Sequence, residues 1–496
     1  MTSWALAVAA AGLLILTVPG FNQNWLAWFA VAPLFVLARR EEARPRIRFL
    51  AGWLAGTLYW AVACWWIEYV LEVNGGMNLG LAWLAFVLFA LYKGLPLAVF
   101  VWLAGWIPLR WWSAVTFAAL WTGIEWTNVW TGFLWIPLGG SAALDSAWLM
   151  RLAPITGVHG IAFAYALMGA VIALVLVYRQ RKALLFACAL LLVLAALPAV
   201  PAPAAGDRSA VVVQPAMPVA AEWTREFLDG RLARLTFQSF HSAALAEGHP
   251  KRLIIWPEMP GPIYYEDDPG FHQLAADIAI RNGDYFLFGT TMLDKDRNPF
   301  NSAILLAPDS GMVGRYDKVN LVPFGEFVPP AFAWVNKITQ EPGNAIPGSR
   351  LTLFPVEGEK VGVFICYESA YPNFVRQFAG NGATFFVNLS NDGYFGESYA
   401  REQHLALVRM RAAENRRWII RATNNGITAV VDPAGRVTER MPEWRETSAI
   451  MKYGVQHETT FYSRHGDWFA WLCLFSGPLM VSRLISVSRL TRNHAD

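Results

Sequence analysis

The sequence predicts a bundle of about eight transmembrane helices joined to an α/β domain that lies outside the membrane. Of the 496 residues, 55% are hydrophobic, only 16% are charged and 24 are tryptophan, which is typical of a polytopic membrane protein. Eight apolar stretches are each close to the ~20 residues that cross ~30 Å of hydrocarbon. Between the seventh and the eighth, about 260 residues alternate short apolar runs with amphipathic ones, a pattern typical of an α/β domain with its own core.

The eight apolar stretches are the predicted membrane spans. The first stretch has no Lys or Arg before it and a second follows at once, so we expect a retained anchor rather than a signal peptide. The spans lie near residues 4–19, 24–38, 49–71, 79–107, 111–130, 160–178, 183–200 and 467–487.

Three charged side chains fall within the predicted spans: Glu68, Lys93 and Glu125. Because an ionisable group in hydrocarbon is costly, each should face protein, water or lipid headgroups. Either Lys93 forms a structural pair with a carboxylate, or these residues form a site for a phospholipid headgroup.

The basic residues of the short loops predict the orientation of the chain. The loops at 20–24 and 73–78 have no basic residue, and the longer loop at 131–159 has only Arg151. Basic residues instead follow the even-numbered spans, at Arg39, Arg40, Arg44, Arg46, Arg48, Arg110, Arg179, Arg181, Lys182, Arg483, Arg489 and Arg492. The positive-inside rule then places both termini in the cytoplasm and the α/β domain outside, which in a bacterium means an inner-membrane protein with a periplasmic domain.

The predicted organisation therefore has three parts. Residues 1–204 hold the first seven helices, residues 205–465 form the exterior domain, and residues 466–496 hold the last helix and a cytoplasmic tail. The net charge of +3 follows from the loop arginines, so it requires no nucleic-acid partner.

Within the exterior domain, the Pro- and Ala-rich linker at 198–209 ends the seventh helix. Helices are predicted at 225–245, 270–282 and 400–416, and the turn signals near 308 and 432 predict hairpins. Strands are predicted at 211–214, 252–256, 285–290, 303–308, 361–366, 384–389, 418–423 and 427–432.

An acid, a base and a thiol lie in three conspicuous segments of this domain. Glu258 is in IIWPEMP, Lys318 in GRYDKVNLVPFGEFVP and Cys366 in VGVFICYESAYP. Glu258 and Cys366 follow predicted strands, where open α/β sheets bind their ligands. Cys366 is the only cysteine of the exterior domain, so in an oxidising compartment it is expected to be a free thiol with a use. No Cys/His pair has zinc spacing, and we expect no metal and no cofactor.

These three side chains suit acyl transfer through a thioester. Glu258 is the expected base for the Cys366 thiol. Lys318, together with a backbone amide such as that of Tyr367, would donate to the tetrahedral oxyanion and favour the thiolate. Taken alone, Cys366 could be a packed core residue, Glu258 a helix cap and Lys318 a solvated lysine. The three residues together favour Cys366 as a nucleophile.

The three segments resemble the Glu–Lys–Cys triad of the nitrilase, or carbon–nitrogen hydrolase, superfamily. The whole chain resembles the apolipoprotein N-acyltransferase family, in which a nitrilase-like domain lies between the seventh and eighth membrane helices. The closest local matches are VPFGEFVP and CYES. The resemblance implies a nitrilase-like αββα sandwich with Glu258, Lys318 and Cys366 as the triad.

The resemblance also matches further functional positions of the family. Trp223 is implied in substrate binding, and Tyr367 follows the nucleophile directly. Glu326 and Glu368 would be acceptors that fix the Lys318 ammonium or the base.

The activity implied by the resemblance is a two-step acyl transfer that ends lipoprotein maturation. Cys366 would take an acyl chain from a phospholipid, expected to be phosphatidylethanolamine, and pass it to the N-terminal diacylglyceryl-cysteine of an apolipoprotein. Extracting a ~16-carbon chain into water would cost on the order of 13 kcal/mol, which explains why such an enzyme carries membrane helices.

The loop at 327–338 is a predicted lid over the acyl entrance, because it combines Phe, Trp and Pro near Lys318. Its candidate substrate-binding residues are Phe327, Phe332 and Trp334, and the segment at 259–265 is a candidate second wall.

Two other classes stay open at the level of sequence. One is a membrane-bound hydrolase of the amidase or nitrilase type, although a small polar substrate gains nothing from the spans. The other is a non-catalytic lipid-binding or transport protein with an inert exterior domain, which the intact triad disfavours.

Overall fold

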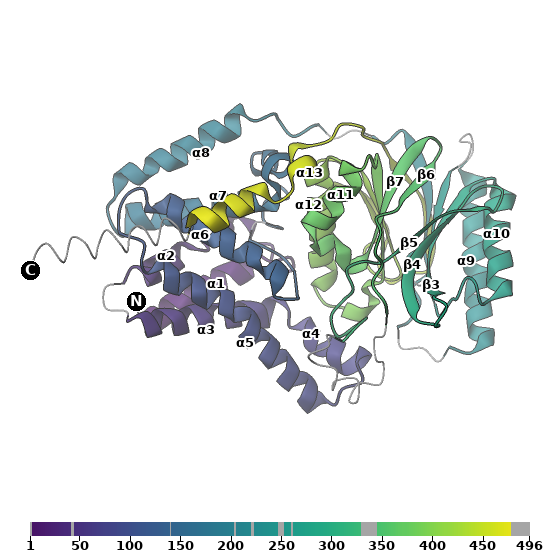
Figure 1. The fold of residues 1–496 in the computed structure, drawn as a ribbon, viewed down its shortest axis with the longest axis horizontal. Helices are drawn as coiled ribbons and strands as arrows, with labels where there is room; N and C mark the ends of the chain where they lie inside the picture. The colour runs from purple at the N-terminus through teal and green to yellow at the C-terminus, as the bar shows by residue number, and fades with distance from the viewer. Residues whose placement is uncertain are drawn as a thin grey trace, which may run out of the picture. The chain divides into compact units, whose positions relative to one another are not determined.

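The computed structural model describes residues 2–40, 44–138, 140–202, 205–219, 223–246, 252–258, 261–328 and 345–477. The chain folds as two compact units, each of which is visible in Figure 1. A helical unit takes in Met1–Glu68, Leu79–Val200 and the chain from His465 onward, and a sheet unit takes in Tyr69–Asn78 and Pro201–Arg464. The short segment Tyr69–Asn78 includes the end of the predicted span 49–71 and the predicted loop at 73–78, and it belongs to the unit that holds the sheets.

Among the described residues, helices occupy every predicted span. They are α1 (Ser3–Leu16), α2 (Ala32–Ala38) with the preceding 3₁₀ turn Asn24–Trp28, α3 (Pro45–Ala63) with α4 (Trp66–Tyr69), α5 (Leu79–Ala104), α6 (Ser113–Trp126), α7 (Ala153–Leu176), α8 (Leu184–Ala196) and Trp468–Gly477.

Within the described ranges, α5 and α7 are each long and apolar enough to cross a membrane alone. The pair Pro45–Ala63 and Trp66–Asn74, bent by 55°, would make a third such span. The remaining apolar helices are shorter, so the count of eight spans and their orientation stay predictions.

Lys93 lies buried in α5 and has only neutral partners in the helical unit. Its Nζ donates to Asn128 Oδ1 at 2.8 Å, to Thr131 Oγ1 at 2.7 Å and to the Phe133 carbonyl at 2.8 Å. The ammonium also lies 4.7 Å from the centre of the Trp60 ring. All three ammonium protons are thus used inside the protein, and the carboxylate partner expected from the sequence is replaced by neutral oxygens.

The sheet unit contains two six-stranded sheets, counted over its described residues. The first has the order β12-β1-β2-β3-β4-β5 and the second the order β11-β10-β9-β8-β7-β6. In each sheet three neighbouring strands are parallel (β1-β2-β3 and β7-β8-β9) and the outer pairs are antiparallel. The strands are β1 (Arg208–Gln214), β2 (Leu253–Ile255), β3 (Tyr285–Leu293), β4 (Pro299–Leu306), β5 (Met312–Asp317), β6 (Leu353–Val356), β7 (Glu359–Ile365), β8 (Phe385–Ser390), β9 (Ile419–Thr423), β10 (Ala429–Val431), β11 (Val437–Arg440) and β12 (Thr447–Tyr453).

Two layers of helices cover the sheets. α9 (Arg225–Leu245) and α10 (Pro269–Asn282) pack on the outer face of the first sheet, and α11 (Pro372–Gly380) and α12 (Ala400–Asn415) pack on the second (Figure 1). The unit is therefore the αββα sandwich that the family resemblance implies.

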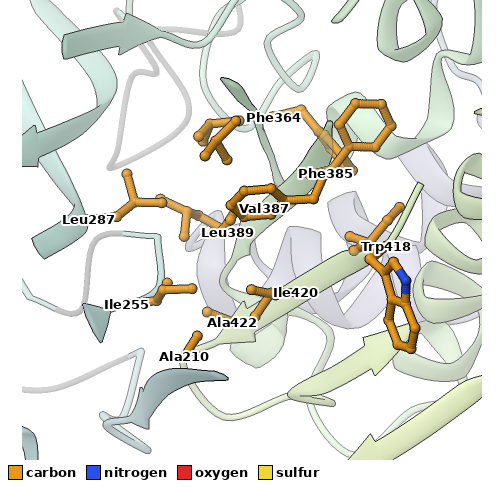
Figure 2. Packing of buried hydrophobic residues seen from close by; sticks show 14 of the residues in the cluster. Ala210, Ile255, Leu287, Phe364, Phe385, Val387, Leu389, Trp418, Ile420 and Ala422 are labelled. Carbon is orange, nitrogen blue, oxygen red and sulfur yellow. The ribbon is translucent and has the colours of Figure 1, made fainter. Parts of the chain in front are cut away.

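The core of the unit lies between the sheets. Figure 2 shows Ala210, Ile255 and Leu287 of the first sheet on one side of this core, and on the other side Val387, Leu389, Ile420 and Ala422 of the second. Central strands such as β8 are buried along their whole length. Such strands are continuous apolar runs in the sequence rather than alternating patterns.

Candidate active site

The three predicted residues lie at the ends of three strands. Glu258 is three residues beyond the end of β2, Lys318 directly follows β5, and Cys366 directly follows β7. Lys318 Nζ is 3.2 Å from Glu258 Oε1, and the charges of both side chains act on the Cys366 thiol. Glu258, Lys318 and Cys366 are only 4%, 1% and 8% exposed. The fold thus brings an acid, a cation and a thiol from both sheets into one buried cluster.

Glu326 completes the ion cluster around Lys318, as expected. Its Oε1 is 2.9 Å from Lys318 Nζ, and its Oε2 accepts the Val322 backbone N–H at 2.8 Å. Because Glu258 contacts the same ammonium, one cation faces two carboxylates. With both carboxylates ionised, the cluster carries a net charge of −1.

Asn301 is a site residue that sequence reasoning missed. Its Nδ2 donates to Glu258 Oε1 and to Glu326 Oε1, each at 2.7 Å, so one amide holds the two carboxylates together. The backbone of Asn301 also positions the cation, because its carbonyl accepts the Lys318 N–H at 2.8 Å. The apolar pattern placed the strand start at 303, whereas β4 begins at Pro299 and includes Asn301.

Replacing Asn301 with aspartate is expected to lower the catalytic rate by about 10²-fold or more, since a third carboxylate would face Glu258 and Glu326. The rate of product formation in membranes measures the effect. Asn298→Asp is the matched control, because Asn298 donates to the Asp294 carboxylate in the turn between β3 and β4. Equal losses in the two variants would contradict a specific role for Asn301.

Glu258 is held from the second sheet as well. The backbone N–H of Asn391, directly after β8, donates to Glu258 Oε2 at 2.9 Å. Both carboxylate oxygens therefore have fixed partners, and the side chain has one defined orientation for accepting a proton.

Glu368 differs from its expected role. It makes no described hydrogen bond to the Lys318 ammonium or to Glu258, and instead holds the backbone beside the triad. Its Oε1 accepts the N–H groups of Val319 at 2.8 Å and Asn320 at 3.0 Å, and its Oε2 accepts that of Ile365 at 2.7 Å. Tyr316 donates its hydroxyl at 2.7 Å. Burial raises the pKa of Glu368 to about 7.

Cys366 has a left-handed backbone conformation, with φ +50°. A non-glycine residue there stores roughly 1–3 kcal/mol, which the surrounding structure must hold in place. It opens the 3₁₀ turn η7 (Cys366–Ala370), whose next residue, Tyr367, is buried with its ring 5.3 Å from that of Tyr371. The thiol therefore lies at a sharp turn directly after a strand end.

Comparison with known proteins agrees with this arrangement. The model of the apolipoprotein N-acyltransferase N-terminal domain matches residues 10–171, and the carbon–nitrogen hydrolase model matches residues 223–459. An apolipoprotein N-acyltransferase of Geobacter metallireducens is 30% identical over 97% of this chain and 95% of the relative. That of Ralstonia nicotianae is 33% identical over 87% of this chain and 84% of the relative.

The chain belongs to the apolipoprotein N-acyltransferase family. It is accordingly an acyltransferase with a catalytic domain of the carbon–nitrogen hydrolase type. Glu258, Lys318 and Cys366 all lie within residues 223–459 of that domain.

The electrostatics of this acyltransferase site do not favour a resting thiolate. Burial raises the pKa of the Cys366 thiol, and Glu258 raises it further, whereas Lys318 lowers it only in part. Burial is the largest cause, and the negative charge of Glu258 adds to it. Lys318 favours the thiolate, as expected, but burial and the carboxylates outweigh it, so deprotonation requires a base at the moment of reaction.

Alkylation of Cys366 by iodoacetamide is therefore expected to keep accelerating as the pH rises beyond 9, because the alkylated species is the thiolate. Glu258→Gln should be alkylated faster than the wild type at pH 8, since it removes a negative charge beside the thiol. Peptide mass spectrometry of Cys366 measures both rates. A rate that levels off at or below pH 8 would contradict the raised pKa.

The candidate substrate-binding residues are only partly described. Trp223 is half-buried, and the centre of its ring lies 5.5 Å from that of Phe227 in an edge-on arrangement. It also packs beside Gly261, because a Cβ added to Gly261 would lie 3.3 Å from the Trp223 ring. Trp223 therefore borders the 259–265 segment beyond Glu258. Phe327 is half-buried, and its carbonyl accepts the Phe324 N–H at 2.7 Å. Phe332 and Trp334, with most of the 327–338 loop, lie outside the described residues.

Proposed function

We propose that this enzyme moves an acyl chain from a membrane phospholipid, expected to be phosphatidylethanolamine, to the α-amine of an apolipoprotein's N-terminal S-diacylglyceryl-cysteine. The observation that carries the proposal is the buried contact of Glu258 with Lys318 beside Cys366, in a chain of this family. Glu258, Lys318 and Cys366 would be the catalytic residues, with Glu326, Tyr367 and Glu368 in support.

In the first half-reaction, Glu258 takes the proton of the Cys366 thiol as sulfur attacks the ester carbonyl carbon. Lys318 and the Tyr367 amide donate hydrogen bonds to the oxyanion, and each such donor is commonly worth ~3–4 kcal/mol. When the tetrahedral intermediate collapses, the bond from carbon to the glycerol oxygen breaks and that oxygen receives the proton from Glu258. The products are a lysophospholipid and a thioester on Cys366.

In the second half-reaction, the neutral α-amine of the acceptor attacks the thioester carbonyl. Glu258 takes a proton from the amine nitrogen, the carbon–sulfur bond breaks, and the proton returns to the Cys366 sulfur. The new amide leaves with the whole acyl chain, so no water is consumed. An α-amine has an ordinary pKa near ~8, which makes its neutral form readily available.

We infer the membrane arrangement from the same chemistry. Residues 1–204 would hold seven spans and residues 466–496 the eighth, with both termini in the cytoplasm. Residues 205–465, which lie between these parts in the sequence, would then be at the outer surface of the inner membrane. The loops at 327–338 and 259–265 would cover the acyl entrance, and water kept from the thioester favours transfer over hydrolysis. The apolar helices in the structure support this arrangement.

The test uses phosphatidylethanolamine vesicles with a ¹³C-labelled acyl chain, the full-length enzyme and a synthetic diacylglyceryl-cysteine peptide. We expect labelled N-acyl peptide and lysophospholipid in equal amounts. Labelled free fatty acid in place of N-acyl peptide would show a hydrolase, and no release from the phospholipid would show a binding protein. Either result would overturn the proposal.

A further inference from the structure

A fully buried charged cluster lies against the backbone of Cys366. Asp392, His404 and Arg421 are each 0% exposed and come from the turn η8 (Asp392–Phe395), from α12 and from β9. His404 Nε2 is 3.0 Å from the Cys366 carbonyl oxygen, and His404 Nδ1 is 2.9 Å from Asp392 Oδ1. Three separate elements therefore meet at one carbonyl group.

The partners fix how the imidazole is oriented. A carbonyl oxygen only accepts hydrogen bonds, so His404 Nε2 must carry a hydrogen and donate a hydrogen bond to the Cys366 carbonyl oxygen. Arg421 Nη2 lies 2.6 Å from Asp392 Oδ2 and 3.2 Å from His404 Nδ1. Burial by itself raises the pKa of Asp392, but Arg421 and His404 hold this pKa well below its usual range. Asp392 is thus a fixed carboxylate that orients the ring.

We propose that His404 is a positioning residue that fixes the peptide between Cys366 and Tyr367, with Asp392 and Arg421 holding its ring in place. The proposal rests on the proposed role of Cys366 as the nucleophile. A trans peptide unit is planar, and its carbonyl and N–H point in opposite directions. Fixing the Cys366 carbonyl therefore fixes the direction of the Tyr367 N–H, the proposed partner of Lys318 at the oxyanion.

The left-handed conformation of Cys366 explains why its backbone must be held by hydrogen bonds. At φ +50° the residue is strained, and it relaxes unless its neighbours hold it. On one side, Glu368 accepts the Ile365 N–H at 2.7 Å, and on the other His404 donates to the Cys366 carbonyl. The strained residue is held through the peptide directly after it and by a hydrogen bond at the N–H of the preceding residue.

A purely structural role explains the cluster less well. Burying several ionisable groups generally gives less stability than a well-packed apolar replacement. The cluster also adjoins the base, because Asp392 directly follows Asn391, whose N–H holds Glu258. One turn thus fixes the base through Asn391 and the nucleophile through Asp392 and His404.

The test compares His404→Leu, which removes the donor, with His404→Gln, whose amide can replace it. Arg411→Met is the matched control, because Arg411 is buried in the same helix but pairs with Glu414 at 2.9 Å rather than with Cys366. Acylation of Cys366 is followed by intact-protein mass spectrometry with two donors, phosphatidylethanolamine vesicles and 4-nitrophenyl acetate. Melting temperatures are measured in parallel.

We expect His404→Leu to slow acylation by about 10²–10³-fold at saturating donor, the effect of losing one oxyanion donor. His404→Gln should retain most of the rate, and Arg411→Met should lower the melting temperature without a comparable loss of rate. A wild-type rate in His404→Leu with 4-nitrophenyl acetate would overturn the inference. So would equal losses in the leucine and glutamine variants, or in the leucine variant and the control. Should the wild type react with the ester but never with the phospholipid, the proposed function fails while the role of His404 is still measured.

Discussion

Cys366→Ala is expected to abolish acyl transfer, with a fall of at least about 10⁴-fold, the scale on which nucleophile removal acts in enzymes with a covalent intermediate. No other cysteine lies between residues 205 and 465, so no second thiol of that domain can take its place. The side chain is small and nearly buried, and the stability of the protein should therefore change little.

Cys188→Ala is the matched control, because Cys188 is an exposed cysteine of α8 in the helical unit. N-acyl peptide formation from phosphatidylethanolamine vesicles is the measurement, with expression and melting temperature recorded beside it. Residual turnover of Cys366→Ala within about tenfold of the control would show that the thioester route is wrong.

Lys318→Met is expected to have the second-largest effect, and it should impair both rate and stability. The cation lies between Glu258 at 3.2 Å and Glu326 at 2.9 Å, so its removal leaves a buried and a half-buried carboxylate facing each other. Breaking a buried pair in this way typically costs ~3–5 kcal/mol of stability. Loss of the oxyanion donor should slow acylation by about 10²–10³-fold in the protein that still folds.

Lys318→Arg separates these two effects. It restores the positive charge, but the broad guanidinium does not reproduce a point donor, so stability should recover more than rate. Lys360→Met serves as the control, since Lys360 is an exposed lysine of β7. Unfolding followed by circular dichroism reports stability, and the accumulation of acyl-enzyme reports rate. Full catalytic recovery in Lys318→Arg would argue that Lys318 acts only as a charge.

The sequence predicted the central strands and missed the edges of the sheets. β2, β7 and β8 are buried on both faces and read as apolar runs, and the hairpins β4-β5 and β10-β11 carry clear turn signals. β6 and β12 were missed, and β5 and β11 were expected only as the second strands of hairpins, without residue ranges. All four pair at the outer positions of the sheets. β11 reads VTER and β6 contains a proline, so neither has an apolar pattern that marks a strand.

Sequence reasoning found the site residues that lie in recognisable motifs, and it missed those that have no motif. Lys318, Glu258 and Glu326 were singled out by their motifs, and the structure brings them into contact. Asn301 and His404 have no motif of their own. Their importance comes from long-range contacts at sequence separations of 43 and 38 residues, which local patterns do not contain.

The effect of the charges on the thiol needed coordinates as well. The sequence suggests one lysine near one cysteine, whereas the structure gives that lysine two carboxylates and buries the sulfur. Burial of the sulfur, together with the sum of these charges, decides whether the resting group is a thiol or a thiolate. In the helical unit, Glu68 Oε1 and Glu125 Oε2 are buried without a hydrogen-bond partner among the described residues. The sequence showed these two residues only as charges within apolar runs.

The central claim is that Cys366 carries the acyl chain between donor and acceptor. Its most direct test is mass spectrometry of the Cys366 peptide after incubation with phosphatidylethanolamine vesicles, followed by addition of the diacylglyceryl-cysteine peptide. We predict one acyl chain on Cys366, sensitive to hydroxylamine, which disappears as the N-acyl peptide forms at the same rate. N-acyl peptide that forms while Cys366 remains unmodified throughout would contradict the account.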